Sequence, residues 1–286
     1  MSETGDLIRR IHEADRTAFD AVGAALPDLE RAAEAIAGRL AMGGRWFNVG
    51  AGTSGRLGVL DAAELPPTFG IDPRLVVGLL AGGREAMFRA IEGAEDDAGA
   101  GARVLTNAGM TGRDAVVGIA ASGRTPFTVG ALRHARKEGA LTVAVVCTPT
   151  TPLLDLADVP ILLDTGPEVL WGSTRMKAGT AQKLALNILS TAVLALHGLV
   201  IDGEMVAMRP TNLKLRARAI RIVERLLEVP PERAEMLLST SAWHLPSALV
   251  SGKWGISPDE AIVHLGLFAG SVARALAEKP VGEKPD

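Results

Sequence analysis

The sequence predicts an α/β protein, in which a three-layer α/β/α sandwich with a parallel sheet is followed by an all-helical C-terminal region. Five short apolar runs rich in β-branched residues alternate with helical patterns up to Thr165, and from about Gly172 onward only helical patterns remain. Strands that are apolar throughout are typical of parallel sheets buried on both faces, and intervening helices are typical of right-handed crossovers.

The elements follow in order along the chain. An amphipathic segment runs from about Ile8 to Leu40, and Gly43 and Gly44 mark a break. Strands are expected at five runs: WFNVG (46–50), LVVGLLAG (75–82), DAVVGIAAS (114–122), LTVAVVCT (141–148) and VPILLDT (159–165).

One long helix is expected over 173–196, followed by three or four shorter helices to Ala277 and a loose tail over 278–286. We therefore expect an N-terminal helical segment (1–42), an α/β domain (43–200) and a C-terminal helical region (201–286).

Composition limits the classes of function. The chain has 286 residues, 48% of them hydrophobic, a net charge of −3 and a pI near 6.0, so a large core is expected and nucleic acid or an anionic membrane is not. A single cysteine and the lack of a secretory segment favour a cytoplasmic protein. The five histidines are scattered without metal-ligand spacing, so we predict no metal and no cofactor.

Two small-residue loops follow predicted strands: GAGTSGRLG (50–58) and AASGRTP (120–126). In a parallel sheet such loops lie at the carboxyl ends of strands, where helix N-termini offer free N–H groups to an anion. The first loop contains G-x-G-x-x-G but lacks the acidic residue expected about 20 residues later, and no P-loop motif is present. Each loop alone also fits a tight turn or a pair of capping hydroxyls, but together they suggest a monophosphate held by neutral donors.

Four blocks resemble the signature blocks of N-acetylmuramic acid 6-phosphate etherases, within the wider SIS (sugar isomerase) superfamily. They are GAGTSGRLGVLDAAELPPTFG (50–70), IEGAEDD (91–97), GIAASGRTPF (118–127) and GSTRMKAGTAQKLALNILST (172–191). The sequence departs from the family pattern at Leu65, where a cysteine is usual, and near Ala207, where an acidic residue is usual. The extra N-terminal stretch that family members usually carry is missing, which we expect to affect assembly.

The resemblance implies an SIS-type fold and cleavage of the D-lactyl ether of N-acetylmuramic acid 6-phosphate, giving N-acetylglucosamine 6-phosphate and D-lactate. The implied route is elimination followed by addition of water, in cell-wall recycling or in uptake of external amino sugar. By correspondence, Glu64 would protonate the departing lactyl oxygen and Glu95 would serve C2 and the water addition. The residues alone also fit a solvated helix end at Glu64 and a hydrated acidic face at 92–97. Pro66 and Pro67 are expected to end the helix just after Glu64 and to hold its carboxylate near the strand ends.

The resemblance also implies which groups bind the 6-phosphate: the hydroxyls and main-chain N–H groups of Thr53, Ser54, Ser122, Thr125, Gly52, Gly55 and Gly123. Arg56 and Arg124 fit either an anion or a structural partner. Ser173 is well placed to cap the long helix, while Ser173, Arg175 and Lys177 could border the sugar pocket, in this subunit or in a neighbour's. A homodimer is implied, with a sugar phosphate as the small-molecule partner.

Two other functions remain open. A sugar-phosphate isomerase would use the same phosphate loops and the same proton abstraction at C2. A non-catalytic SIS regulator would bind a sugar phosphate and act through a partner, but no basic helix-turn-helix segment accompanies the α/β core. Glu64 and Glu95, both present in their blocks, favour the etherase.

Overall fold

The structure is a computed structural model that describes residues 2–280, so the last six residues of the predicted tail lie outside the described part. The described chain forms two compact units. The first holds the chain up to Glu64 together with Asp72–Val193, and the second holds Leu65–Ile71 and the chain from Leu194 onward. No helix in the described part is long and apolar enough to cross a membrane.

The α/β part has the elements that the sequence predicts, and each of the five strands lies inside a predicted run, which extends up to three residues beyond it. In chain order they are α1 (Glu3–Ala24), α2 (Leu26–Ala41), β1 (Trp46–Gly50), α3 (Gly52–Phe69), β2 (Val76–Leu80), η1 (Gly83–Met87), α4 (Ala98–Asn107), β3 (Ala115–Ile119), α5 (Pro126–Lys137), β4 (Leu141–Val146), α6 (Pro152–Leu156), β5 (Val159–Leu162) and α7 (Lys177–Leu196).

All five strands pair in parallel in the order β2-β1-β3-β4-β5, with Trp46 opposite both Val76 and Ala115. Because β1 lies inside the sheet with β2 and β3 on either side, the strand order reverses there. Loops at the carboxyl ends of β1 and β3 therefore lie side by side, which is where open α/β sheets bind ligands.

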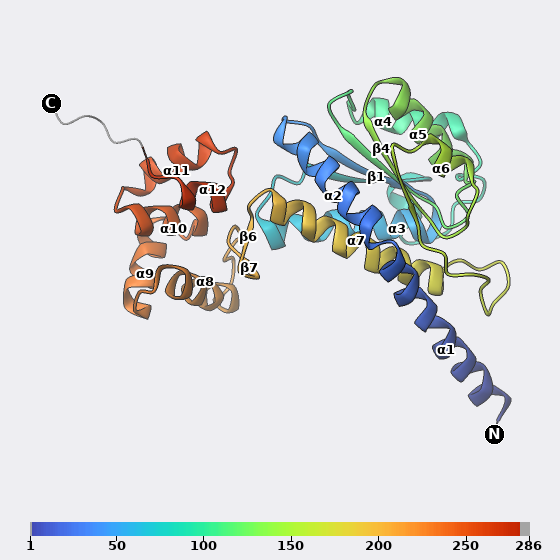
Figure 1. Ribbon diagram of the computed structural model, residues 1–286, viewed down its shortest axis with the longest axis horizontal. Helices are drawn as coiled ribbons and strands as arrows, with labels where there is room; N and C mark the ends of the chain where they lie inside the picture. The colour runs from blue at the N-terminus through green and yellow to red at the C-terminus, as the bar shows by residue number, and fades with distance from the viewer. Residues whose placement is uncertain (1, 281–286) are drawn as a thin grey trace. The chain divides into compact units, whose positions relative to one another are not determined.

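Helices cover both faces of this sheet and give the predicted three layers (Figure 1). On one face, α4, α5 and α6 pack against alternate strand residues such as Phe47, Val116 and Ala144. On the other face α2 contacts β4 and β5, while α3 lies against β1 and β2 and is joined to α7 by side-chain hydrogen bonds. The fold class is confirmed.

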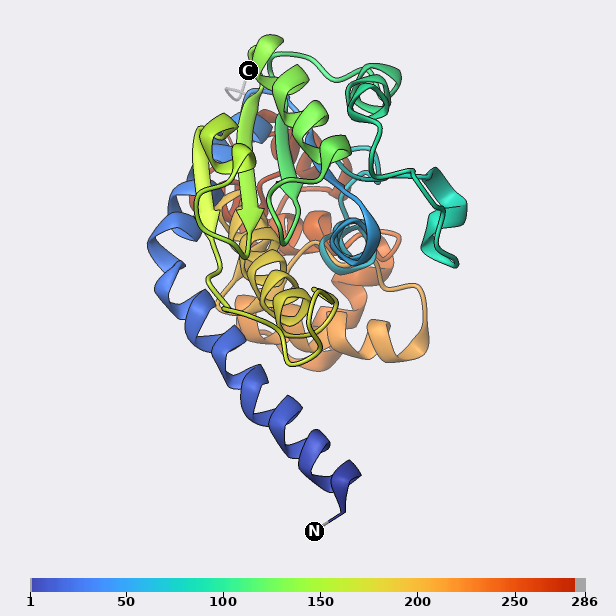
Figure 2. The ribbon, with the colours of Figure 1, turned by 90° about the vertical axis from the view of Figure 1, so that its right-hand side faces the viewer.

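Helix α1 packs on α2 near Ala18 and Val22, and its N-terminal half extends away from the sheet (Figures 1 and 2). Three large apolar side chains on α1 are exposed: Leu7, Ile8 and Phe19.

The second unit is mostly helical but not wholly so, which corrects the expectation of an all-helical region. Its elements are β6 (Val200–Ile201), β7 (Glu204–Met205), α8 (Leu213–Leu227), α9 (Pro231–Thr240), α10 (Leu245–Trp254), α11 (Pro258–Leu267) and α12 (Val272–Ala277), so five helices follow α7 instead of three or four. Strands β6 and β7 form an antiparallel hairpin whose turn residues, Asp202 and Gly203, both have positive φ. An Asp-Gly pair is the usual signal for this turn.

Two predicted helix ends were wrong. Helix α3 continues through Pro66 and Pro67 to Phe69, and it ends at Gly70, whose φ of 68° suits a C-terminal cap. A proline ring is compatible with helical φ, so two prolines in the last turns cost hydrogen bonds without stopping the helix.

Helix α7 begins at Lys177, four residues later than predicted, so Ser173 is not its cap. The carboxylate of Glu168 instead accepts a hydrogen bond from the N–H of Ala178, at 3.1 Å. A carboxylate at this position favourably meets the positive end of the helix dipole.

Candidate active site

The first loop lies between β1 and α3, and its side chains contact the start of α7. The Ser54 side chain is buried and its hydroxyl donates to Oε1 of Gln182 at 2.8 Å, while the methyl group of Thr53 lies beside Gly179. The Ser54 hydroxyl can therefore still accept a hydrogen bond, but it cannot donate a second one. The loop glycine Gly52 has a φ of 54°, a conformation that few other residues adopt.

The second loop keeps its polar groups available at the start of α5. Thr125 is the N-cap residue of α5, yet its side chain makes no capping hydrogen bond. Ser122 is exposed and only accepts a long hydrogen bond, 3.3 Å, from the N–H of Arg124. Gly123 has a φ of 61° and lies directly against Thr151, where a Cβ atom would overlap the threonine side chain. Both hydroxyls are thus free to meet an anion, whereas the start of α5 offers few N–H groups, because Pro126 has none and that of Phe127 is hydrogen-bonded.

The two loop arginines have structural partners. Arg56 donates to the carbonyl groups of Ala86, Met87 and Arg89, and so fastens the segment around η1 to α3. Arg124 donates to the carbonyl of Thr150 at 3.0 Å. Of the two alternatives for these arginines, the structure favours the structural one.

Glu95 lies next to the second loop. Its main-chain carbonyl accepts a hydrogen bond of 2.9 Å from the N–H of Phe127, in the first turn of α5, and its side chain is exposed. The neighbouring Asp97 has a structural task, because it caps α4 and pairs with Arg103. These hydrogen bonds lower the pKa of Asp97. Within the acidic stretch, Asp97 is thus a capping residue, whereas Glu95 has a free carboxylate and lies next to the loop that is expected to bind phosphate.

Glu64 lies elsewhere, and the expectation that the prolines hold it near the carboxyl ends of the strands was wrong. Successive residues of α3 descend along the sheet: Gly55 lies against Gly50 at the end of β1, and Val59 lies against Gly78 in the middle of β2. A helix rises about 1.5 Å per residue, so the five residues that follow carry Glu64 toward the amino ends of these strands. The structure therefore does not bring Glu64 and Glu95 together.

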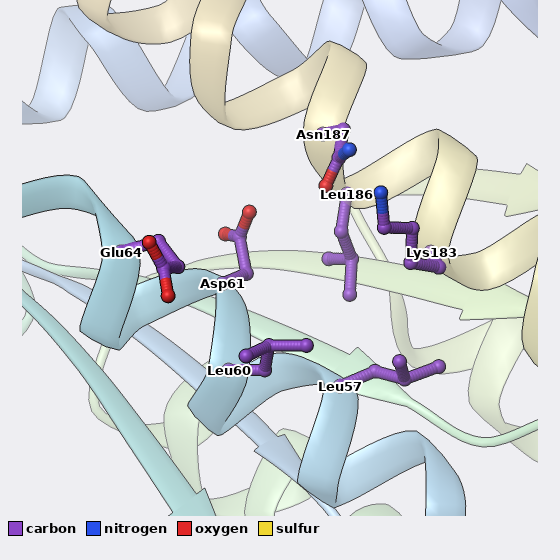
Figure 3. A pocket seen from close by; sticks show the side chains of 7 residues that line it. All are labelled: Leu57, Leu60, Asp61, Glu64, Lys183, Leu186 and Asn187. Carbon is purple, nitrogen blue, oxygen red and sulfur yellow. The ribbon is translucent and has the colours of Figure 1, made fainter. Parts of the chain in front are cut away.

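Glu64 instead lines a cavity of about 350 Å³ between α3 and α7. Figure 3 shows side chains of the two helices facing each other across it. Its lining combines three leucines with four polar residues: Leu57, Leu60, Leu186, Asp61, Glu64, Lys183 and Asn187. This volume lies in the range of small-molecule sites.

Asp61 is the most buried polar residue of this cavity, with 8% of its surface exposed. Its Oδ1 accepts a hydrogen bond from the Ser190 hydroxyl at 2.9 Å, whereas Oδ2 has no hydrogen-bond partner within the described chain. Burial raises the pKa of Asp61 to about 6, and Ser190, Asn48 and Lys183 partly oppose this shift. Sequence reasoning missed Asp61, although its place one helical turn before Glu64 in an otherwise apolar stretch was a usable signal.

The GSTRMK block borders the first loop, since Thr53 and the carbonyl of Thr174 both approach Gly179. Ser173 and Arg175 lie in the turn before α7, and Arg175 is exposed. Lys177 is only 6% exposed and forms no hydrogen bond or ion pair with the described residues. A buried cation without a partner is costly, and a bound anion would remove that cost.

A second cavity, of about 450 Å³, lies at the carboxyl ends of β4 and β5, where Trp171 and Thr174 join Asp164 and Glu168 in its lining. Cys147 also lines it, and burial together with these two carboxylates raises the pKa of the thiol to about 12. Cys147 therefore stays a neutral thiol and is not a nucleophile. Within residues 2–280, no His, Cys, Asp and Glu side chains gather into a possible metal site.

Comparison with known proteins gives matches along the whole chain. The model described as "Glucokinase regulatory protein N-terminal SIS domain" matches residues 28–136, and the SIS domain model matches residues 98–192. An N-acetylmuramic acid 6-phosphate etherase of Rubrobacter xylanophilus is 48% identical over 99% of this chain and 92% of its own length. N-acetylmuramic acid 6-phosphate etherase 2 of Vibrio cholerae is 45% identical over 96% of this chain and 89% of its own length.

Solved structures agree on the fold. A putative phosphosugar isomerase involved in capsule formation from Bacteroides fragilis superposes with a TM-score of 0.51 at 21% identity, over 68% of this chain and 94% of its own. At this identity the similarity concerns the fold alone, and it supports the SIS-type sandwich.

Proposed function

The chain belongs to the N-acetylmuramic acid 6-phosphate etherase family, and we propose that it cleaves the D-lactyl ether of N-acetylmuramic acid 6-phosphate. The observation that carries this proposal is the sequence identity of 45–48%, over nearly the whole chain, to relatives that bear this name. No feature of the structure favours the isomerase or the non-catalytic regulator over the etherase.

The reaction needs two proton-transfer groups and one water molecule. A base removes the proton from C2 of the open-chain sugar, the C3–O bond breaks, and the departing ether oxygen takes a proton and leaves as D-lactate. Water then adds to C3 while C2 regains a proton, which gives N-acetylglucosamine 6-phosphate. We assign the protonation of the ether oxygen to Glu64, and the proton at C2 and the water addition to Glu95.

The 6-phosphate would bind between the two loops. The free hydroxyls of Ser122 and Thr125 support this placement, as does Thr53 at the neighbouring β1 loop. Ser54 would have to release Gln182 before its hydroxyl could donate to the phosphate. Of the expected main-chain donors, Gly55 and Gly123 already donate to the carbonyls of Ala51 and Ala120, so only the N–H of Gly52 would add a donor. Lys177, at the start of α7, is buried and has no hydrogen bond or ion pair with the described residues, which supports a role for the GSTRMK block in holding an anionic substrate. Ser173 and Arg175 would join it at the pocket edge.

The separation of Glu64 from Glu95 supports a site built by two chains. The two glutamates act on C2 and on the oxygen of C3, which are neighbouring atoms of the substrate. In the chain, however, Glu64 lies toward the amino ends of the strands and Glu95 lies at their carboxyl ends, roughly 15 Å apart along the strands. They are also carried by elements on opposite faces. We therefore propose a homodimer in which the Glu64 cavity of one chain meets the phosphate loops and Glu95 of the other. Exposed Leu60 and Ile188, on the helices that form the cavity, suit a subunit contact.

We also propose a cytoplasmic setting, because the one cysteine, Cys147, is a buried thiol and the proposed substrate is a phosphorylated sugar.

The test is to incubate the purified chain with N-acetylmuramic acid 6-phosphate and to measure D-lactate, with isotopically labelled water present. We expect D-lactate in equal amount to N-acetylglucosamine 6-phosphate, with solvent oxygen at C3. Glu64→Gln should lower kcat by about 100-fold or more, because it removes a proton donor. Glu30→Gln, on an exposed face of α2, is the matched control and should leave the rate unchanged.

Two results would contradict the proposal. Ligand binding without D-lactate would favour the regulator, and aldose–ketose interconversion of a hexose phosphate would favour the isomerase.

A further inference from the structure

The cavity between α3 and α7 carries more than Glu64. Its polar wall is formed by Lys183 and Asn187 of α7, which face the α3 residues across the cavity (Figure 3). Neither side chain forms a hydrogen bond or an ion pair with the described residues, and both are exposed. The cavity thus offers one free amide and one cation, which is close enough to Asp61 to lower the pKa of that carboxyl but forms no ion pair with it.

Apart from the carboxyl groups of Asp61 and Glu64, the rest of the lining is apolar. Leu57 and Leu60 of α3 and Leu186 of α7 contribute three side chains, so the cavity suits a ligand with a small apolar part next to an anionic part.

The substrate group beside the ether bond has this combination. The lactyl group consists of a methyl group and a carboxylate on the carbon that bears the ether oxygen, so its carboxylate lies only two bonds from that oxygen. Whichever cavity delivers a proton to the ether oxygen must also hold the methyl group and the carboxylate. This step depends on the proposed function, which places Glu64 at the ether oxygen.

We infer that the cavity between α3 and α7 is the binding site for the lactyl group. Lys183 and Asn187 bind its carboxylate, and Leu57, Leu60 and Leu186 pack against its methyl group. Lys183 is therefore a specificity-determining residue, which separates the 3-O-lactyl sugar phosphate from sugar phosphates without this group.

The two carboxyl groups of the cavity do not prevent this binding. In the proposed arrangement Glu64 faces the ether oxygen and not the lactyl carboxylate. Asp61 is set back in the wall and is held by Ser190, and its pKa of about 6 leaves part of it neutral in weakly acidic solution. Lys183 is exposed, and it acts on Asp61 strongly enough to lower the pKa of that carboxyl, so it also places a positive charge within reach of a bound carboxylate.

The experiment compares two ligands that differ only in the lactyl group. In a Glu64→Gln background, which slows turnover, the Kd of N-acetylmuramic acid 6-phosphate and that of N-acetylglucosamine 6-phosphate are measured by calorimetry. Adding Lys183→Met should weaken the first ligand by about 10- to 100-fold, the usual loss for a charged hydrogen bond, and should change the second less than about twofold. Adding Lys183→Arg should restore most of the affinity.

Two further variants complete the design. Lys137→Met, on an exposed part of α5, should change neither affinity, and Ser122→Ala should weaken both ligands because both carry the phosphate. The inference is overturned if Lys183→Met weakens both ligands equally or weakens neither. If the wild type releases no D-lactate, the proposed function fails, and the same titrations can then be made with wild-type protein, so the two failures are distinguishable.

Discussion

Asp61 shows how one buried carboxyl group couples the candidate site to stability. Its pKa is about 6 in the folded chain against an ordinary value of 3.8, because burial disfavours the charged form. The folded state therefore binds more protons than the unfolded state between these two values. Above pH 6 the ionised group costs the fold up to about 3 kcal/mol, and the cost disappears as the pH falls through this window toward 4.

We predict that Asp61→Asn stabilises the fold in a pH-dependent way. The amide keeps an acceptor for the Ser190 hydroxyl but cannot ionise, so the gain in unfolding free energy should be larger near pH 8 than near pH 4.5. Urea unfolding at both pH values measures it. Asp20→Asn, on the exposed face of α1, is the control and should show no such difference. An equal effect of Asp61→Asn at both pH values would contradict the assigned cause.

At the scale of single residues, the sequence predicted some polar groups of the candidate site and missed others. The pairing of a serine and a threonine around the start of α5 was predicted, and the structure leaves both hydroxyls without a capping task. Gln182, whose amide oxygen accepts the hydrogen bond from Ser54, was not predicted, since the two residues are separated by 128 positions and only packing of α7 on α3 brings them together.

At the scale of elements, α4 and α5 meet closely enough for their backbones to touch. Gly101 of α4 and Gly130 of α5 lie at the contact, and a Cβ atom on either would overlap a carbonyl oxygen of the other helix, that of Phe127 or of Ala98. Glu95 precedes α4 and is bonded to the first turn of α5. The position of the proposed catalytic carboxylate therefore depends on this contact.

We predict that Gly130→Ala destabilises the fold by about 1–3 kcal/mol, because the added methyl group must push the helices apart. It should also lower kcat, since the displacement moves Glu95. Thermal unfolding and D-lactate release measure the two effects. Gly38→Ala in α2 is the matched control: its Cβ would meet no atom, and alanine favours a helix, so stability should stay equal or rise. A Gly130→Ala variant as stable and active as the wild type would refute the prediction.

At the scale of the whole molecule, the separation of the two glutamates leads to a test by mixing chains. We predict that Glu64→Gln and Glu95→Gln homodimers are both nearly inactive, and that refolding the two chains together restores activity. Random pairing makes half of the dimers mixed, and each mixed dimer has one intact site, so about a quarter of wild-type activity should return. D-lactate release from the refolded mixture measures it.

A second mixture serves as the control. Ser122→Ala and Glu95→Gln would affect the same side of the proposed site, so no mixed dimer of these two chains has an intact site. At substrate concentrations too low to saturate the Ser122→Ala site, activity should not rise above that of the separate variants. If the first mixture also stays inactive, each chain must build its own site, and the two-chain arrangement is wrong.

The sequence by itself determined the fold class, the five strands and the positions of both small-residue loops. Each of these follows from local order: apolar runs alternate with amphipathic ones, and Gly, Ser and Thr gather where a strand turns into a helix. The helix ends were harder to predict from the sequence. Helix α3 ends at Gly70 and not at the prolines, and the start of α7 is capped by Glu168 and not by Ser173.

The tertiary structure alone decided what surrounds Glu64. Residues 57–64 of α3 and 183–187 of α7 are far apart in sequence, and their cavity exists only because both helices cover the same face of the sheet. The structure also decided that Glu64 and Glu95 lie apart. A crossover helix runs antiparallel to its strand, so each turn along α3 carries a side chain farther from the loop where the helix began, and sequence spacing cannot show this direction until the helix is placed on the sheet.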